Sequence, residues 1–312
     1  MLAKNLVDFY DLIIIGGGPA GLTAGLYAKR ALLNTLLIEK GPLGGQVIYT
    51  DLIENYPGFP EGISGYDLME LFKKQVEKYG LPIYQGEVKD FKDYHDYKEV
   101  LLSSGESLKA KALILALGAS PKKLNIPGER EFTGKGVSYC AICDGPFYKG
   151  EIVAVVGGGN TALQEALYLT KFANKVYLIH RRESFRATAI LQEKVKENPK
   201  IELLLPRVVE KIKGKDKVEG ILVKNLKTNE IQELEVSGVF IFIGLTPQTE
   251  WLKGKIALDE GGFILTDREM RTNVPGVFAC GDCISKKYRQ IINACGEGAV
   301  AALSAEEYIK GL

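Results

Sequence analysis

Two glycine-rich motifs with matching surroundings are the feature of this chain that most restricts its fold. Gly16–Gly21 (GGGPAG) fits the pattern G-x-G-x-x-G, and Gly157–Ala162 (GGGNTA) fits G-x-G-x-x-A. A strand, a glycine turn and a helix N-terminus together present free backbone N–H groups to a pyrophosphate. Each motif here follows an apolar strand-like run and precedes a helix-like run: Asp11–Ile15 and Leu22–Arg30, then Ile152–Val156 and a stretch to about Phe172. This repeated context predicts an α/β fold with two dinucleotide-binding units.

The two copies differ at the position that reads the adenosine ribose. Glu39 lies 23 positions after Gly16, and His180 lies 23 positions after Gly157. A carboxylate at this offset accepts hydrogen bonds from ribose hydroxyls and repels a 2′-phosphate, so the first copy predicts FAD or NAD. A basic cluster attracts that phosphate, so the second copy predicts NADP, and the alternative is a solvated basic loop. The cluster consists of His180, Arg181, Arg182 and Arg186.

Similar segments follow both copies. Turn-rich stretches with alternating residues predict a small antiparallel meander in each, at Gly86–Ala110 and Ile201–Val236. The meanders close on apolar strands, Ala112–Leu117 and Val239–Ile243. Gly118–Gly128 and Gly244–Trp251 contain proline and are expected to be connectors.

The remaining segment, Gly262–Leu312, is too short to form a domain alone, so we expect it to rejoin one of the two units. Within it, Gly276–Cys280 is strand-like and Gly298–Ile309 is helix-like.

Composition excludes several classes of protein. The 312 residues carry 40 basic and 39 acidic side chains, a net charge of +1, so no strong field points to nucleic acid or to an anionic membrane. No apolar run is long enough to span a bilayer. The opening MLAKNLVDFYDL has no uninterrupted apolar stretch, so we expect no secretory signal and a cytoplasmic, reducing location. With only two histidines, a His-rich metal site is excluded.

The chain resembles the low-molecular-weight thioredoxin reductases of bacteria and archaea from near its first residue to near its last. YCAICDG and HRRESFRA are the most specific of the matching stretches, because glycine motifs alone fit many flavoproteins. The other stretches are GGGPAGLTAGLYAKR, GGQ at Gly44–Gln46, ENYPGFP, GGGNTALQEALYL, GVFACGDC and YRQIINACGEG. Leu117 stands where the family often has threonine, and CGDC has more cysteine than the family pattern needs.

The resemblance implies a fold of two Rossmann-like, three-layer domains in a homodimer. Residues 1–118 and 245–312 would form a discontinuous FAD domain. Residues 119–244 would form an inserted NADPH domain that carries the redox C-x-x-C.

The resemblance also implies the cofactor contacts. For FAD it points to Gly16, Gly18, Pro19, Ala20 and Gly21 at the pyrophosphate, Glu39 on the ribose, Gln46 and Asn55 on the flavin side, Asp282 near the ribityl chain, and Arg289, Gln290 and Ile291 along the cofactor. For NADPH it points to Gly157, Gly159, Asn160 and Thr161 at the pyrophosphate, with His180, Arg181, Arg182 and Arg186 at the 2′-phosphate.

Five cysteines need separate interpretation. Cys140 and Cys143 form a C-x-x-C whose spacing allows reversible disulfide closure, which favours a redox role. Cys280 and Cys283 form a second pair that would complete a Cys₄ zinc site, but 140 residues separate the pairs, far beyond zinc-ribbon spacing. We therefore expect no metal, and we interpret Cys280, Cys283 and Cys295 as incidental core residues.

The implied reaction is NADPH-dependent reduction of a thioredoxin-like protein disulfide. In the family, the cysteine matching Cys143 lies next to the flavin and the one matching Cys140 attacks the partner. Asp144 is positioned in sequence to carry the proton, although it also suits the turn before Gly145-Pro146. The family alternates between half-reactions by rotating the inserted domain. Two alternatives remain open, a reductase of another disulfide protein such as a glutaredoxin-like one, and a non-catalytic flavin- or NADP-binding redox sensor.

Overall fold

The computed structural model describes residues 7, 9–50 and 52–311, and its residues group into two compact units. Unit 1 comprises the residues up to Ser120 and those from Thr246 onward, and unit 2 is Pro121–Leu245. Of the opening stretch that argues against a signal peptide, residues 1–6 and 8 lie outside the described part. Within the described part, no helix combines the length and the apolar character needed to cross a membrane.

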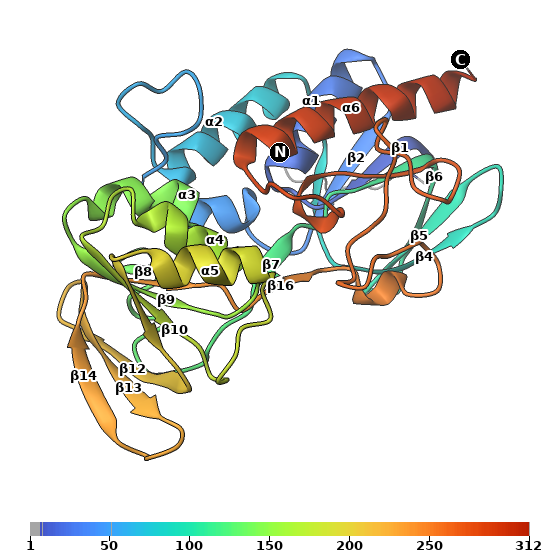
Figure 1. Ribbon diagram of the computed structural model, residues 1–312. Coiled ribbons are helices and arrows are strands. Elements are labelled where there is room, and N and C mark those ends of the chain that lie inside the picture. The colour runs from blue at the N-terminus through green and yellow to red at the C-terminus, as the bar shows by residue number, and fades with distance from the viewer. Residues whose placement is uncertain (1–6, 8, 51, 312) are drawn as a thin grey trace. The chain divides into compact units, whose positions relative to one another are not determined.

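Unit 1 is built on one seven-stranded sheet in the order β3-β2-β1-β6-β5-β4, with β17 also paired to β6 (Figure 1). The β1, β2, β3, β6 and β17 strands are parallel, whereas β4 and β5 form an antiparallel extension beyond β6. The strands are β1 Phe9–Ile15, β2 Thr35–Glu39, β3 Ile83–Gln85, β4 Val88–Asp93, β5 Lys98–Leu102, β6 Ser107–Leu115 and β17 Val277–Ala279.

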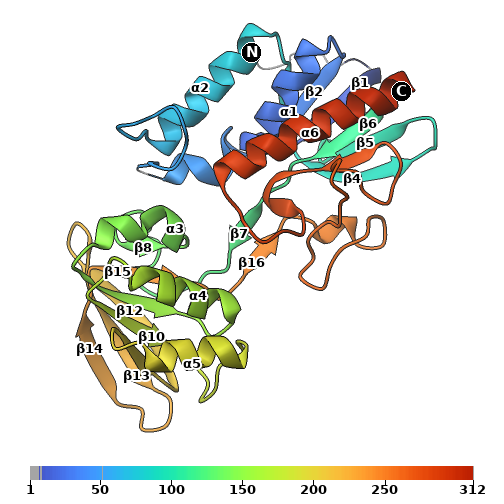
Figure 2. The same ribbon diagram turned by 45° about the horizontal axis from the view of Figure 1, so that its top comes forward.

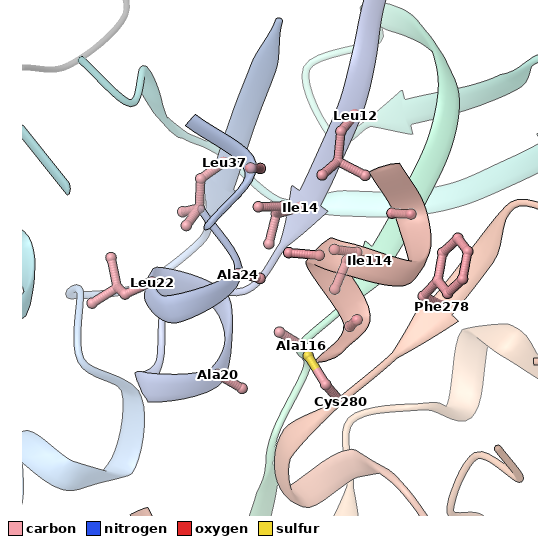
Figure 3. Packing of buried hydrophobic residues seen from close by; sticks show 14 of the residues in the cluster. Leu12, Ile14, Ala20, Leu22, Ala24, Leu37, Ile114, Ala116, Phe278 and Cys280 are labelled. Carbon is pink, nitrogen blue, oxygen red and sulfur yellow. The ribbon is translucent and has the colours of Figure 1, made fainter. Parts of the chain in front are cut away.

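The β1 strand shows why this part of the chain reads as a continuous apolar run. Leu12 and Ile14 face one core and Ile13 and Ile15 face the other, so both faces of the sheet are covered. The first core lies under the helices and includes Ala20, Ala116 and Cys280, drawn in Figure 3. The unit's helices are α1 Pro19–Arg30, α2 Gly65–Lys78 and α6 Ile291–Lys310, with short 3₁₀ turns η1 Gly45–Tyr49, η3 Glu250–Leu252 and η4 Gly281–Cys283.

The β6 strand corrects one expectation. The end of the first meander and the apolar strand Ala112–Leu117 were expected to be separate, but Ser107–Leu115 is one strand. Its first half alternates between buried and exposed residues, where it pairs with β5, and its second half is buried throughout, between β1 and β17. The change in pattern along the strand reflects a change from one covered face to two.

The α6 helix corrects a second expectation, because it begins at Ile291 rather than at Gly298. Gly296 and Gly298 weaken the helical signal of its first turns. Gly298 is nevertheless required, since a Cβ there would collide with the backbone carbonyl oxygen of Ala20 on α1. The glycine therefore lets the two helices approach closely, at the point where the first glycine motif enters α1.

Unit 2 has three layers. Its central sheet is parallel, in the order β11-β10-β9-β15-β8, with α4 and α5 packed on one face and a separate sheet, β12-β13-β14, on the other. The strands are β8 Val137–Ser138, β9 Ile152–Val156, β10 Lys175–Ile179, β11 Ile201–Leu204, β12 Arg207–Gly214, β13 Val218–Asn225, β14 Ile231–Glu235 and β15 Gly238–Ile241. The helices are α3 Ala141–Asp144, α4 Asn160–Leu169 and α5 Ala189–Glu197, with a 3₁₀ turn η2 Gly145–Tyr148.

A third correction concerns Ile201–Leu204. These residues were expected to open the second meander, but they form β11, which pairs in parallel with β10. A run of four residues is too short for alternation to distinguish a meander strand from an edge strand of the parallel sheet. The expected turn near Gly214 does join β12 to β13. With these corrections, the predicted α/β class with parallel sheets is confirmed.

The two chain segments that join the units run side by side as a short ladder (Figure 2). It is formed by β7, Ala119–Pro121, and β16, Leu245–Pro247. Just beyond β7, the amide of Lys122 donates to the carbonyl of Gly244 at 3.0 Å. Entry to and exit from unit 2 therefore share one hydrogen-bonded pair of strands.

Candidate active site

The first glycine turn has the backbone that a close approach to a ligand needs. Gly16 has φ of +109°, and a Cβ there would collide with the carbonyl of Ala116 on the next strand. Gly21 packs against the carbonyl of Gly16, so it too has no room for a side chain. By contrast, a Cβ on Gly18 would meet nothing within 4 Å. Pro19 then begins α1 without needing its missing amide hydrogen, and Ala20 is buried behind it.

Glu39 lies at the end of β2 and joins this turn directly. Its Oε2 accepts from the amide of Gly17 at 2.6 Å, and its Oε1 accepts from the amide of Gly41 at 2.7 Å. Each carboxylate oxygen keeps a further lone pair. The carboxylate is thus held rigidly beside the turn with capacity to accept from a hydroxyl.

Two contacts join distant parts of unit 1, and the first of them lies at this turn. The amide of Gly44, just before Gln46, donates to the carbonyl of Gly17 at 2.8 Å. The side chain of Asn55 donates to Oε1 of Gln290 at 3.1 Å, although 235 positions separate them. Gln290 is the N-cap of α6, and Ile291 is its first residue. The structure therefore brings together side chains that the sequence alone places far apart.

Two residues that sequence reasoning missed, Lys286 and Glu297, contact the turn that carries Asp282. Lys286 Nζ lies 3.2 Å from Asp282 Oδ1 and 2.7 Å from Glu297 Oε2, and Glu297 also accepts from the amide of Gly281 at 2.9 Å. Burial raises the pKa of Glu297, and the ammonium of Lys286 opposes that shift. The available signal was the pattern of Lys286 four residues after an aspartate, which sequence reasoning passed over. Asp282 is therefore held by a buried charge network.

Arg289 supports the same turn from the other side. Its guanidinium donates to the carbonyls of Lys286, Ile284 and Asp282 at 3.0, 3.3 and 3.4 Å, and it lies over the ring of Phe263. The arginine thus fixes the loop between η4 and α6.

Two observations indicate that the residues of unit 1 fit a bound dinucleotide. The space over Gly18 is open at the N-terminus of α1, where backbone N–H groups favour a pyrophosphate. The buried Oδ1 of Asp282 forms an ion pair with Lys286 but accepts no hydrogen bond from the described residues, so it can still accept from a ligand hydroxyl.

The second glycine turn is folded together with its basic loop. Gly157 has φ of +155°, and Gly159 caps α4 with open space above it. The amide of Arg186 donates to the carbonyl of Gly158 at 2.8 Å, and the amide of Thr188 donates to Oδ1 of Asn160 at 2.8 Å. Thr161 follows, exposed in the first turn of α4.

Three arginines surround this turn without anionic partners. Within the described ranges, no ion pair involves the exposed guanidinium groups of Arg181, Arg182 and Arg186. Unpaired cations gathered at a helix N-terminus suit a ligand that carries both a pyrophosphate and a further phosphate.

His180 lies under the basic loop and is the buried member of the cluster. Its Nε2 has no hydrogen-bond partner among the residues that the structure describes, and its ring stacks on Phe185. Burial, followed by the charges of Arg186, Arg181 and Arg182, lowers the pKa of His180 below its usual 6.5. Because the unfolded chain then binds a proton more readily, His180 reduces stability as pH falls through 6.5 and costs nothing well above it.

A phosphate dianion should oppose the part of this shift that the arginines cause. We expect NADP⁺ to raise the pKa of His180, because the dianion neutralises the surrounding guanidinium charges, whereas NAD⁺ should raise it less. NMR titration of the imidazole signals measures this directly. His95, in the β4–β5 turn of unit 1, supplies an internal reference signal that should not respond to either nucleotide. Equal responses of His180 to NADP⁺ and NAD⁺ would contradict the assignment of the cluster to a 2′-phosphate.

The redox loop lies in unit 2, just after β8. Cys140 and Cys143 form a disulfide with their Cα atoms 5.3 Å apart, and both are half-buried. The Sγ of Cys140 accepts from the amide of Cys143 at 3.2 Å. That amide would favour a thiolate at Cys140 once the disulfide is reduced. The pair is therefore both accessible and chemically asymmetric.

Asp144 follows directly, at the end of α3, where its amide donates to the carbonyl of Cys140 at 3.1 Å. Burial, and then the charge of Asp144, raises the pKa of Tyr148 to about 12. The carboxyl is thus near Tyr148, and its role in proton transfer to the sulfurs stays a prediction.

The other three cysteines are free and buried. Burial raises the pKa of Cys283 to about 11 and raises those of Cys280 and Cys295. Cys280 packs in the core under α1 and α6 (Figure 3). Cys283 packs in the core on the opposite side of the sheet. Within the ranges that the structure describes, no group of three metal-ligating side chains is arranged to hold an ion.

Comparison with known proteins defines the class to which this fold and site belong. Residues 10–298 match the model of the pyridine nucleotide-disulphide oxidoreductase family, and the chain is a member of that family. Its members are oxidoreductases that use a nicotinamide and a flavin cofactor, and both glycine turns have the geometry that such cofactors need.

Within the family, several similar proteins are thioredoxin reductases. The chain is 45% identical to the thioredoxin reductase of Peptoclostridium acidaminophilum, over 97% of this chain and 98% of that protein. The crystal structure of thioredoxin reductase from Streptococcus pyogenes matches with a TM-score of 0.94 at 43% identity, covering 98% of this chain and 99% of that one. The crystal structure of Lactococcus lactis thioredoxin reductase in its FR conformation is also 43% identical. The match covers 97% of this chain and 100% of that one, with a TM-score of 0.66.

Proposed function

We propose that this chain is a thioredoxin-disulfide reductase, which passes electrons from NADPH through FAD and the Cys140–Cys143 disulfide to a thioredoxin-like protein. The observation that carries the proposal is the half-buried disulfide in the unit that also holds the basic glycine turn. A structural disulfide would not need this combination of accessibility and nucleotide-binding context. The names of the similar proteins support the same substrate.

The choice of FAD and NADPH follows from the two turns. Glu39 beside the first turn favours an unphosphorylated adenosine. The GGQ stretch is bonded to this turn through Gly44, and the ENYPGFP and YRQ stretches are bonded to each other through Asn55 and Gln290, which supports a flavin site in the same unit. Arg181, Arg182 and Arg186, with His180, favour the 2′-phosphate of NADPH at the second turn. We assign FAD to unit 1 and NADPH to unit 2.

The reaction balances as NADPH + H⁺ + protein disulfide → NADP⁺ + protein dithiol. The bound cofactors would supply the electron pair that cleaves the Cys140–Cys143 bond. Cys140 then attacks the partner's disulfide as a thiolate, which the amide of Cys143 stabilises. Cys143 resolves the mixed disulfide and reforms the intramolecular bond. Asp144 accepts the proton of one thiol and returns it to the leaving thiolate.

The surface of the loop suits a protein substrate. Ile142 and Phe147 are 37% and 46% exposed on either side of Cys143, so apolar contacts are available next to the reactive sulfurs.

We further infer a homodimer in the cytoplasm. Exposed apolar side chains on α6, namely Ile292, Val300 and Leu303, offer a face for a second copy. Light scattering should give about twice the chain mass of 34.2 kDa, and a monomer at micromolar concentration excludes the dimer.

The proposal is tested by assaying NADPH oxidation with purified thioredoxin-like and glutaredoxin-like proteins from the same cell, alongside an aromatic disulfide dye. Thioredoxin-like partners should be reduced with a kcat/KM at least about tenfold above the others. Preferential reduction of a glutaredoxin-like protein would mean that the partner is of that kind, while the proposed disulfide reduction by NADPH would stand. Failure to reduce both the dye and every partner, in protein that binds flavin, would favour the redox sensor.

A further inference from the structure

A buried carboxylate in unit 2 collects three hydrogen bonds that the reaction does not explain. Glu129 is 3% exposed. Its Oε1 accepts from the amide of Leu124 at 3.0 Å and from the hydroxyl of Tyr139 at 2.8 Å, and its Oε2 accepts from the amide of Asn125 at 2.6 Å. Carboxylates are rarely this buried unless they hold something in place.

The groups that Glu129 joins belong to two functional segments. Leu124 and Asn125 follow closely after β7, the strand by which the chain enters unit 2. Tyr139 directly precedes Cys140 and follows β8. One side chain therefore connects the entry segment to the redox loop, and we call Glu129 and Tyr139 the loop clamp.

Two further contacts support the loop clamp, one at Tyr139 and one in the turn that carries Glu129. The ammonium of Lys123 lies 3.9 Å from the centre of the Tyr139 ring, a cation–π contact. Gly128 has φ of +87° and packs against the carbonyl of Ile212, which fixes the turn that carries Glu129. Burial, and then the Glu129 carboxylate, raises the pKa of Tyr139, so the hydroxyl remains a donor throughout the physiological range.

The backbone at Cys140 is held by contacts within the loop. Its amide donates to the hydroxyl of Ser138 at 3.1 Å, and its carbonyl accepts from that hydroxyl at 3.3 Å and from the amide of Asp144 at 3.1 Å. All of these partners belong to the loop and to β8, which is only two residues long. The Tyr139 hydroxyl instead joins the loop to Glu129, so it contributes to fixing where the loop holds Cys140. A displacement of about 1 Å at a reacting group can cost up to a hundredfold in rate.

We propose that Glu129 and Tyr139 are positioning residues for the redox disulfide, which hold Cys140 in its attacking orientation and make the loop move as one piece with the entry strand. This inference rests on the proposed function, because it concerns the step in which Cys140 transfers electrons to a partner. Neither residue needs to touch the flavin, the nicotinamide or the partner.

Four variants separate positioning from simple structural support. They are Tyr139→Phe, Glu129→Gln, the double variant, and Tyr177→Phe as a matched control. Tyr177 also packs on the meander core, has the Lys175 ammonium 4.4 Å from its ring centre and has a hydroxyl bonded at 3.2 Å to Lys175, but it lies on β10 rather than in the loop. Each holoenzyme is assayed for NADPH-dependent reduction of a thioredoxin-like protein, and of ferricyanide, which takes electrons from the flavin without the disulfide.

Tyr139→Phe should lower kcat for the disulfide substrate about tenfold, leaving ferricyanide reduction and the KM for NADPH within about twofold. Tyr177→Phe should change neither activity. The double variant should be no slower than the slower single variant, since both singles break the same contact. If Glu129→Gln does not fold, Tyr139→Phe and its control still decide the question.

Three results would overturn the loop clamp: unchanged disulfide reduction in Tyr139→Phe, equal losses in both assays, or additive losses in the double variant. A different result would overturn the proposed function instead, namely a wild-type enzyme that reduces ferricyanide but no disulfide substrate. The wild-type assay therefore separates failure of the clamp from failure of the function on which it rests.

Discussion

Replacing Cys143 by serine should reduce NADPH-dependent disulfide reduction by at least about 1000-fold. A serine hydroxyl cannot form the disulfide with Cys140, so the electron pair has no dithiol in which to be held and no resolving thiol can release the partner. Ferricyanide reduction by NADPH should stay within about twofold, because it needs the nucleotide and flavin sites alone. Steady-state assays with both acceptors on the same preparation measure this contrast.

The matched control for this variant is Cys295→Ala. Cys295 is a free cysteine on α6 that accepts a weak hydrogen bond from the hydroxyl of Tyr56 at 3.8 Å and takes no part in the proposed reaction, so both activities should survive. Disulfide reduction that persists in Cys143→Ser would assign the redox role elsewhere, with the buried Cys280 and Cys283 as the first residues to examine. Loss of both activities together with the flavin absorbance would indicate misfolding rather than chemistry.

Removing two positive charges at the second glycine turn should switch the enzyme's nucleotide preference. In the variant Arg181→Gln/Arg186→Gln, we expect the KM for NADPH to rise about 100-fold and that for NADH to change less than about threefold. A charge-assisted hydrogen bond contributes roughly 1.5–3 kcal/mol, and the exposure of both guanidinium groups reduces this through solvent screening. The ratio of the two KM values, measured at fixed ionic strength, is the decisive quantity.

Lys213→Gln provides the control for surface charge in the same unit. Lys213 pairs with Glu233 at 2.6 Å on the β12–β13–β14 sheet, and its loss should leave both KM values unchanged. If the arginine variant weakens NADPH and NADH equally, the guanidinium groups bind the shared pyrophosphate rather than the 2′-phosphate. Elevated salt should reduce the NADPH effect, as expected for exposed charges.

Much of the fold is predictable because the parallel-sheet signals are local. Strands β1, β2, β9 and β10 are short apolar runs next to glycine turns, and the structure has them close to the expected residues. The errors occur where local signals conflict with packing. Gly298 weakens the helical pattern of α6, yet close contact with Ala20 on α1 requires a glycine there. Likewise β11 has four residues, too few to show which sheet it joins.

The residues of the candidate site also differ in whether local sequence signals predict them. Glycines and arginines at fixed offsets can be read from the chain, because the motif itself forms the turn. The Lys286–Glu297 pair and the loop clamp cannot, since they join residues 11 and 10 positions apart through backbone turns rather than along one element. Their roles become visible only when burial and hydrogen-bond partners are known.

The contact between Asn55 and Gln290 has a consequence for how the protein is made. Translation completes residues 121–245 well before residue 290 is added, so unit 2 and its two redox cysteines are able to fold on the ribosome while the sheet of unit 1 still lacks β17 and α6. The flavin site proposed for unit 1 is thus completed late. For that interval the nascent chain has its redox cysteines but not the complete site for the proposed cofactor, so their thiol state is set by the surrounding redox environment.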